Sequence, residues 1–76
     1  MKSIFDEAMK LITDNGEIPM VGWDLGQGIV IVEIGGDNPY DLMRRVDTKK
    51  RQVANCALSI RQMQELRKKK PHVYRS

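Results

Sequence analysis

The amino-acid sequence predicts a small α+β protein: a short N-terminal helix, a two-stranded antiparallel hairpin and a long basic C-terminal helix. Three observations lead to this fold class. The 76 residues leave room for one domain, and a composition of 41% apolar and 30% charged residues is that of a globular chain. Residues 29–34 are almost all β-branched, which favours a strand. Neither Gly nor Pro interrupts residues 40–70, so that stretch is free to form helix.

The N-terminal helix is predicted over residues 3–14. Ser3 is a suitable N-cap residue, and Asp6 follows three positions later, as in a capping box. The next apolar residues recur at intervals of three and four and therefore share one helical face: Ile4, Phe5, Ala8, Leu11 and Ile12. Asp14-Asn15-Gly16 ends the helix, because Asn and Gly tolerate the left-handed backbone conformation that is common just beyond a C-terminus.

Two strands are predicted next, over residues 18–23 and 29–34. The intervening loop contains two glycines, so an antiparallel hairpin is the simplest connection. Pro19 cannot donate a ladder hydrogen bond and is best placed at a sheet edge. Trp23 either completes the core or is exposed as an anchor for a partner. We favour the core, which is the more common position of a lone Trp.

Helical structure is predicted for the remainder of the chain up to Pro71. Pro39 suits the first position of a helix, because the amide hydrogen that it lacks has no partner there. Two alternatives remain open: one continuous helix, or a short helix over residues 39–46 and a long one over residues 48–69. The second alternative arises because the side chain of Asp47 or Thr48 could cap a new helix.

An interrupted heptad pattern runs along this predicted helix. Its apolar members would form one seam, into which Lys49 intrudes: Leu42, Val46, Val53, Cys56, Ile60 and Met63. Such a seam has three possible partners. The chain's own first helix and hairpin could cover it, a second copy could cover it in a homodimer, or it could enter an apolar groove on another protein.

Charge is distributed unevenly along the sequence. Residues 1–43 carry two lysines and eight acidic residues, a net charge of −6, whereas residues 44–76 carry eleven Lys or Arg and two acidic residues, a net charge of +9. This division predicts an anionic partner for the basic half, or attraction between the two halves. The basic residues proposed to make the contact are Arg44, Arg45, Lys49, Lys50, Arg51, Arg61, Arg67, Lys68, Lys69 and Lys70.

The leading functional prediction is a small non-catalytic protein whose basic helix contacts nucleic-acid phosphates. Base stacking is not expected, because Tyr74 is the one aromatic residue near the basic stretch. The alternative is a regulator or inhibitor of a larger enzyme or complex, in which the same helix enters an acidic or apolar groove. A third possibility is an assembly or connector subunit. The helix–hairpin–helix layout resembles that of phage head–tail joining proteins, without a shared motif.

Catalytic, metal and cofactor sites are not predicted. The sequence has one Cys and one His, which leaves no ligand set for a metal, and Cys56 on the apolar seam reads as an inert thiol. His72 falls in residues 71–76, which are predicted to be a mobile tail after a domain of residues 1–70. No signal peptide or membrane span is recognised, so a cytoplasmic protein is expected.

Overall fold

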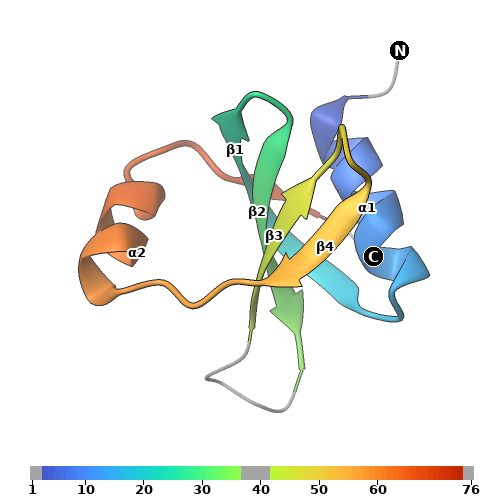
Figure 1. Cartoon of the computed structure of the whole chain (residues 1–76). Coiled ribbons are helices and arrows are strands. Elements are labelled where there is room, and N and C mark those ends of the chain that lie inside the picture. The colour runs from blue at the N-terminus through green and yellow to red at the C-terminus, as the bar shows by residue number, and fades with distance from the viewer. Residues whose placement is uncertain (1–2, 37–41, 75–76) are drawn as a thin grey trace.

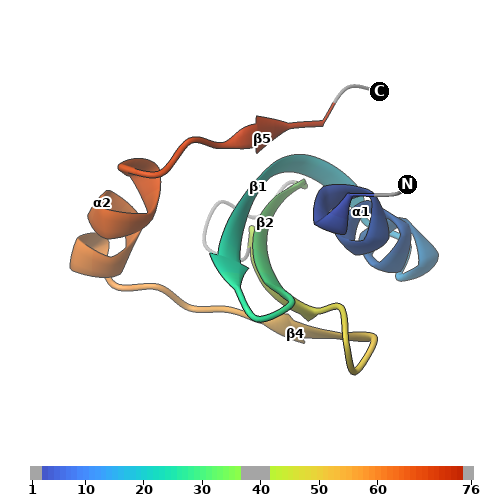
Figure 2. The same ribbon diagram turned by 90° about the horizontal axis from the view of Figure 1, so that it is seen from above.

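The computed structural model describes residues 3–36 and 42–74. In this part of the chain, two helices lie on opposite faces of a five-stranded antiparallel sheet (Figures 1 and 2). In chain order the elements are α1 (Ile4–Asp14), β1 (Ile18–Gly26), β2 (Ile29–Gly35), β3 (Met43–Asp47), β4 (Gln52–Asn55), α2 (Ile60–Arg67) and β5 (His72–Val73).

The sheet has the strand order β4-β3-β2-β1-β5. Strands β1 to β4 form a meander of neighbouring hairpins, and β5 returns after α2 to pair with β1. The β1–β2 pairing has two irregularities, between Pro19 and Val21 and between Asp24 and Gly26. Such bulges increase the bend of a strand, and Figure 2 shows β1 and β2 curving strongly around α1.

The main core lies between α1 and the concave face of the sheet. Helix α1 starts with the predicted capping box, in which Ser3 and Asp6 each accept a hydrogen bond from the other's backbone amide. On β2 the alternate residues face α1, because side chains of a strand point in turn to its two faces. They form one buried cluster with residues of α1, β3 and the C-terminal segment: Ala8, Ile12, Val30, Val32, Ile34, Val46 and Tyr74.

A smaller apolar cluster lies on the opposite face, beneath α2. It is formed by Trp23, Ile31 and Leu66, with partly buried side chains around it that include Cys56 and Leu58. Trp23 is 5% exposed, which confirms its prediction as a core residue. Its indole Nε1 is buried and makes no hydrogen bond within the described part of the chain.

The predicted long C-terminal helix is wrong. Met43–Asp47 and Gln52–Asn55 are strands β3 and β4, so the predicted fold of one helix, one hairpin and one long helix is replaced by a sheet of five strands with two helices. The predicted break at Asp47-Thr48 is the point at which the chain turns. The Asp47 carboxylate accepts a hydrogen bond from the Lys50 amide (3.0 Å), and Thr48 donates through its hydroxyl to the Gly28 carbonyl (2.8 Å). The first contact lies within the turn between β3 and β4, and the second joins this turn to the β1–β2 loop, so neither side chain caps a helix.

The C-terminal segment also differs from the expectation of a mobile tail. His72 and Val73 pair with Gly22 and Val21, and the Tyr74 side chain is buried in the main core. The predicted helix start at Pro39 lies outside the described residues.

The predicted N-terminal helix and first hairpin are confirmed. Helix α1 spans Ile4–Asp14, and β1 and β2 pair as an antiparallel hairpin in which β1 continues three residues farther than expected, to Gly26. Within the described part of the chain, no helix has the length and apolar character needed to cross a membrane.

Candidate binding surface beside helix α2

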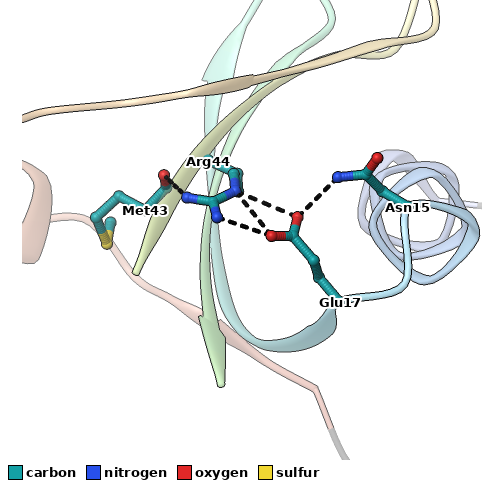
Figure 3. Close-up of polar contacts among 4 residues, drawn as sticks. All are labelled: Asn15, Glu17, Met43 and Arg44. Atoms are coloured by element: carbon teal, nitrogen blue, oxygen red, sulfur yellow. Dashed lines mark hydrogen bonds and ion pairs between the residues drawn. The ribbon is translucent and has the colours of Figure 1, made fainter. Parts of the chain in front are cut away.

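Arg44 is the one predicted contact residue that the structure buries: it is 7% exposed. It lies on the concave face of the sheet, where Val32 is its cross-strand partner. Its guanidinium holds the Glu17 carboxylate with three hydrogen bonds, from Nη2 to Oε2 (2.7 Å) and from Nε to Oε1 (3.2 Å) and Oε2 (3.1 Å) (Figure 3). Nη1 donates to the Met43 carbonyl (2.9 Å). Arg44 therefore joins β3 to the segment between α1 and β1 and is removed from the binding surface.

The same contact sets the ionisation of Glu17. The hydrogen bonds from Arg44 lower the pKa of the Glu17 carboxyl below its ordinary value, although burial acts in the opposite direction. A hydrogen bond from Asn15 Nδ2 to Oε1 (3.0 Å) lowers this pKa further. The ion pair is therefore intact at neutral pH.

The other nine predicted basic residues are exposed, and they fall into two groups on different parts of the molecule. The first, the turn group, is the β3–β4 turn: Lys49, Lys50 and Arg51. The second, the α2 group, consists of Arg45, Arg61, Arg67, Lys68, Lys69 and Lys70. Arg45 belongs with α2 because its cross-strand partner is Ile31, which packs under that helix. In both views the β3–β4 turn and α2 lie on opposite sides of the sheet (Figures 1 and 2).

An apolar hollow of about 550 Å³ opens between α2 and the sheet. We refer to it as the α2 hollow. Its apolar lining comes from three separate segments, namely β1–β2, the segment before α2 and α2 itself: Leu25, Ile31, Leu58 and Leu66. Its cationic lining consists of Arg61, Lys68 and Lys69, and Gln62 and Glu65 complete it. Three cations and one carboxylate thus surround an apolar floor.

A second, smaller hollow of about 320 Å³ lies on the other side of α2 and contains Cys56. Glu33 and Arg67 also line it, so its lining is more polar than that of the α2 hollow. Burial raises the pKa of the Cys56 thiol, and the nearby charge of Arg45 only partly offsets this effect. A thiol with a raised pKa is a weak nucleophile at neutral pH, which agrees with the predicted inert role.

The residues of the predicted heptad seam do not share a helical stripe. Val46 and Val53 are cross-strand neighbours on the α1 side of the sheet, and Ile60, the first residue of α2, is 79% exposed. Leu42, Cys56 and Met63 do come together, but as lining of the second hollow. The structure therefore offers no continuous seam for a helix-mediated dimer in its described residues.

The sequence prediction missed the start of α2, although the sequence contains a signal for it. Ser59 and Gln62 form a capping box: the Ser59 hydroxyl accepts from the Gln62 amide (3.1 Å), and the Gln62 side chain accepts from the Ser59 amide (2.9 Å). This pattern locates a helix N-terminus at residue 59. The apolar side of the α2 hollow had no such signal, because its leucines come from distant parts of the sequence.

Residues 3–36 and 42–74 contain no group of three or more His, Cys, Asp or Glu side chains placed to hold a metal ion. Comparison of the chain with known protein families, characterised proteins and solved structures finds no match.

Proposed function

We propose that this chain is a small non-catalytic binding protein that docks on an acidic region of a larger protein through the surface beside α2, and thereby regulates that partner. The observation that carries the proposal is the combination of an apolar floor with a cationic border in the α2 hollow. Apolar area supplies affinity between proteins, and charges at the border steer association and select the partner.

Nucleic acid is the second candidate partner, and the exposed cations of the α2 group favour it. Six Lys or Arg on one side of a small molecule could neutralise several phosphates. The protein partner is preferred because phosphate binding leaves the apolar floor without a role. Base stacking also has little support, since the described aromatic residues are buried or partly buried, with Phe5, His72 and Tyr74 packed together beside α1.

Charge reversal in two matched triple variants tests the proposal. Lys68→Glu, Lys69→Glu and Lys70→Glu change the α2 group, whereas Lys49→Glu, Lys50→Glu and Arg51→Glu change the turn group by the same total charge. Each tagged protein is used to capture partners from lysate with and without nuclease treatment. We expect a protein partner that survives nuclease, is retained by the turn variant and is lost by the α2 variant.

Two outcomes would contradict this expectation. Capture that disappears with nuclease would favour nucleic acid, and direct titration with a duplex oligonucleotide at increasing salt would then show a steep loss of affinity. Capture that both triple variants retain equally would exclude the α2 group as the contact surface.

A further inference from the structure

We infer that the α2 hollow binds an acidic amphipathic peptide segment. Such a segment has leucine-sized side chains on one face and Asp or Glu on the neighbouring faces. This inference rests on the proposed function and specifies the part of the partner that the surface recognises. Four features of the hollow support it: its size, its charge, its openness and the loose attachment of α2.

The size and lining of the hollow suit several aliphatic side chains together. A volume of about 550 Å³ lies within the range of about 300–1,000 Å³ of sites that bury organic ligands. Four aliphatic side chains, Leu25, Ile31, Leu58 and Leu66, form its apolar surface. Leu25 is 46% exposed, so a large part of its side chain is still in contact with water. Covering it would remove further apolar area from water and so favour binding.

The charge of the hollow selects an acidic partner. Arg61, Lys68 and Lys69 line it with Glu65, and Lys68 Nζ contacts the Glu65 carboxylate (3.0 Å). That pair is exposed and contributes little to stability, so Lys68 can exchange Glu65 for a carboxylate of the partner at small cost. Arg61 and Lys69 make no ion pair in the described part of the chain. Among the described residues, the border thus presents two cations without an ion pair and one exchangeable cation.

A peptide fits this hollow better than a nucleobase or an acyl chain does. None of the described residues that line it is aromatic, so an unstacked base would find no ring to stack on. The hollow is an open trough rather than an enclosed cavity. An acyl chain lying in it would keep one side in water, whereas an amphipathic helix presents its apolar face to the trough and its polar face to solvent.

The attachment of α2 allows the hollow to adjust to its occupant. Of the eight residues of α2, Leu66 is the buried one, and it joins the helix to Trp23 and Ile31. Extended or irregular segments, 56–59 and 68–71, lead into and out of the helix (Figures 1 and 2). A helix held at one buried contact between two such segments can shift relative to the sheet without disturbing the α1 core.

The direct test uses a synthetic peptide of about four helical turns, with Leu on one face and Glu and Gln on the others, capped at both ends. Binding is followed by fluorescence anisotropy of a labelled peptide. The intrinsic emission of Trp23 gives a second signal, because Trp23 is the one Trp of the sequence and packs behind Ile31 and Leu66. Two control peptides replace Leu by Ala or Glu by Lys. We expect saturable binding of the first peptide, with at least about tenfold weaker binding of each control.

Matched protein variants locate the site. Leu25→Glu places a carboxylate in the hollow, and Ile18→Glu makes the same change at another exposed position of β1 (61% exposed) outside the α2 hollow. Lys69→Glu reverses a charge of the border, and Lys50→Glu reverses one in the turn group. The first variant of each pair should weaken binding about tenfold or more. The second should change it less than about twofold.

Any of the following results would overturn the inference: no binding of the Leu/Glu peptide, equal binding of the Ala control, equal effects of the paired variants, or displacement of the peptide by laurate at the same site. A duplex oligonucleotide that displaces the peptide equally well from the wild type and from Leu25→Glu would also overturn the inference. Charge alone, without the apolar floor, would then explain the peptide binding. The inference can also fail while the proposed function stands. If the Lys68–Lys70 variant loses its nuclease-resistant partner while the peptide does not bind, the docking surface stands and the acidic amphipathic segment does not.

Discussion

The two faces of the sheet are built in different ways, although both are covered by a helix. On the concave face, α1 buries Ala8 and Ile12 completely against Val30, Val32 and Val46. The Glu17–Arg44 ion pair and the stacked rings of Phe5 and His72 lie at the edges of this core. On the convex face, α2 buries one residue and has a hollow on each side. The concave side therefore holds the more completely packed core, and the convex side leaves apolar surface uncovered. The following changes measure how far this division holds.

The largest effects on the free energy of unfolding are expected when a buried side chain on the α1 side is truncated. Ile12→Ala removes a fully buried side chain and leaves a closed cavity, so the free energy of unfolding should fall by about 2–5 kcal/mol. Leu66→Ala should cost no more than about 2 kcal/mol, because the adjoining hollow already leaves that region incompletely packed. Urea denaturation of both variants measures the difference. Equal losses would mean that α2 is as tightly packed as α1.

The next effect concerns the ion pair of Glu17 and Arg44. Glu17→Gln should lower the free energy of unfolding by about 1.5–3 kcal/mol at neutral pH, because it weakens charged hydrogen bonds in a largely buried setting. Glu65→Gln removes the exposed pair of α2 and should cost less than about 0.5 kcal/mol. Thermal unfolding of the two variants gives the comparison.

The contribution of the Glu17–Arg44 ion pair to the free energy of unfolding should depend on pH in a definite direction. Since the fold lowers the pKa of Glu17, the stabilisation by the ionised carboxylate is fully present above the ordinary Glu value of 4.5. It is lost as the pH falls from there through the lower pKa of the folded protein. The stability difference between the wild type and Glu17→Gln should therefore shrink below about pH 4.5. A difference that is constant from pH 7 to pH 3 would contradict the assigned ion pair.

A smaller effect is expected at Tyr74, whose hydroxyl donates to the Phe5 carbonyl (2.8 Å). Tyr74→Phe should cost about 1 kcal/mol, the usual contribution of one such hydrogen bond. Burial, with a contribution from the charge of Asp6, raises the pKa of Tyr74 to about 12. A raised pKa means that the stabilisation by the neutral phenol is complete below pH 10 and declines as the pH approaches 12. Stability curves at alkaline pH should therefore fall more steeply for the wild type than for Tyr74→Phe.

The smallest effect is expected at Ile60. Ile60→Ser changes a residue that is 79% exposed and should alter the free energy of unfolding by less than about 0.5 kcal/mol. A loss comparable with that of Leu66→Ala would show that the first turn of α2 packs against something in solution, and sedimentation analysis would then show whether a second copy supplies that contact.

The sequence predicts an element correctly where one short segment contains all the signals for that element. Helix α1 has its cap and its apolar stripe within eleven residues, and the β1–β2 hairpin has its β-branched run and glycine loop close together. Strand β3 was not recognised because Arg44 faces the core at a position where alternation calls for an apolar residue. Its partner Glu17 is 27 residues away, so no local pattern indicates that this charge is paired.

The candidate site was likewise predictable only where its signal is local. Composition and charge located the basic residues, and nine of the ten are on the surface. The assignment of these residues to one helix was wrong, because β-branched Val46 and Val53 pair across two strands instead of repeating along a helix. The apolar floor of the α2 hollow combines Leu25, Leu58 and Leu66, which only the return of the chain across the sheet brings together. No local rule could have predicted that combination.

The contact between Phe5 and the C-terminal segment also bears on the order of folding. His72 stacks on the Phe5 ring, with 4.5 Å between ring centroids, and Tyr74 bonds to the Phe5 backbone, so partners nearly seventy residues apart complete the core. Until residues 72–74 are synthesised, β1 keeps an unpaired edge and the first turn of α1 lacks its contacts with His72 and Tyr74. Contacts of such sequence separation form late and slow the search for the native state. On the ribosome, the edge of β1 should remain unpaired until strand β5 emerges.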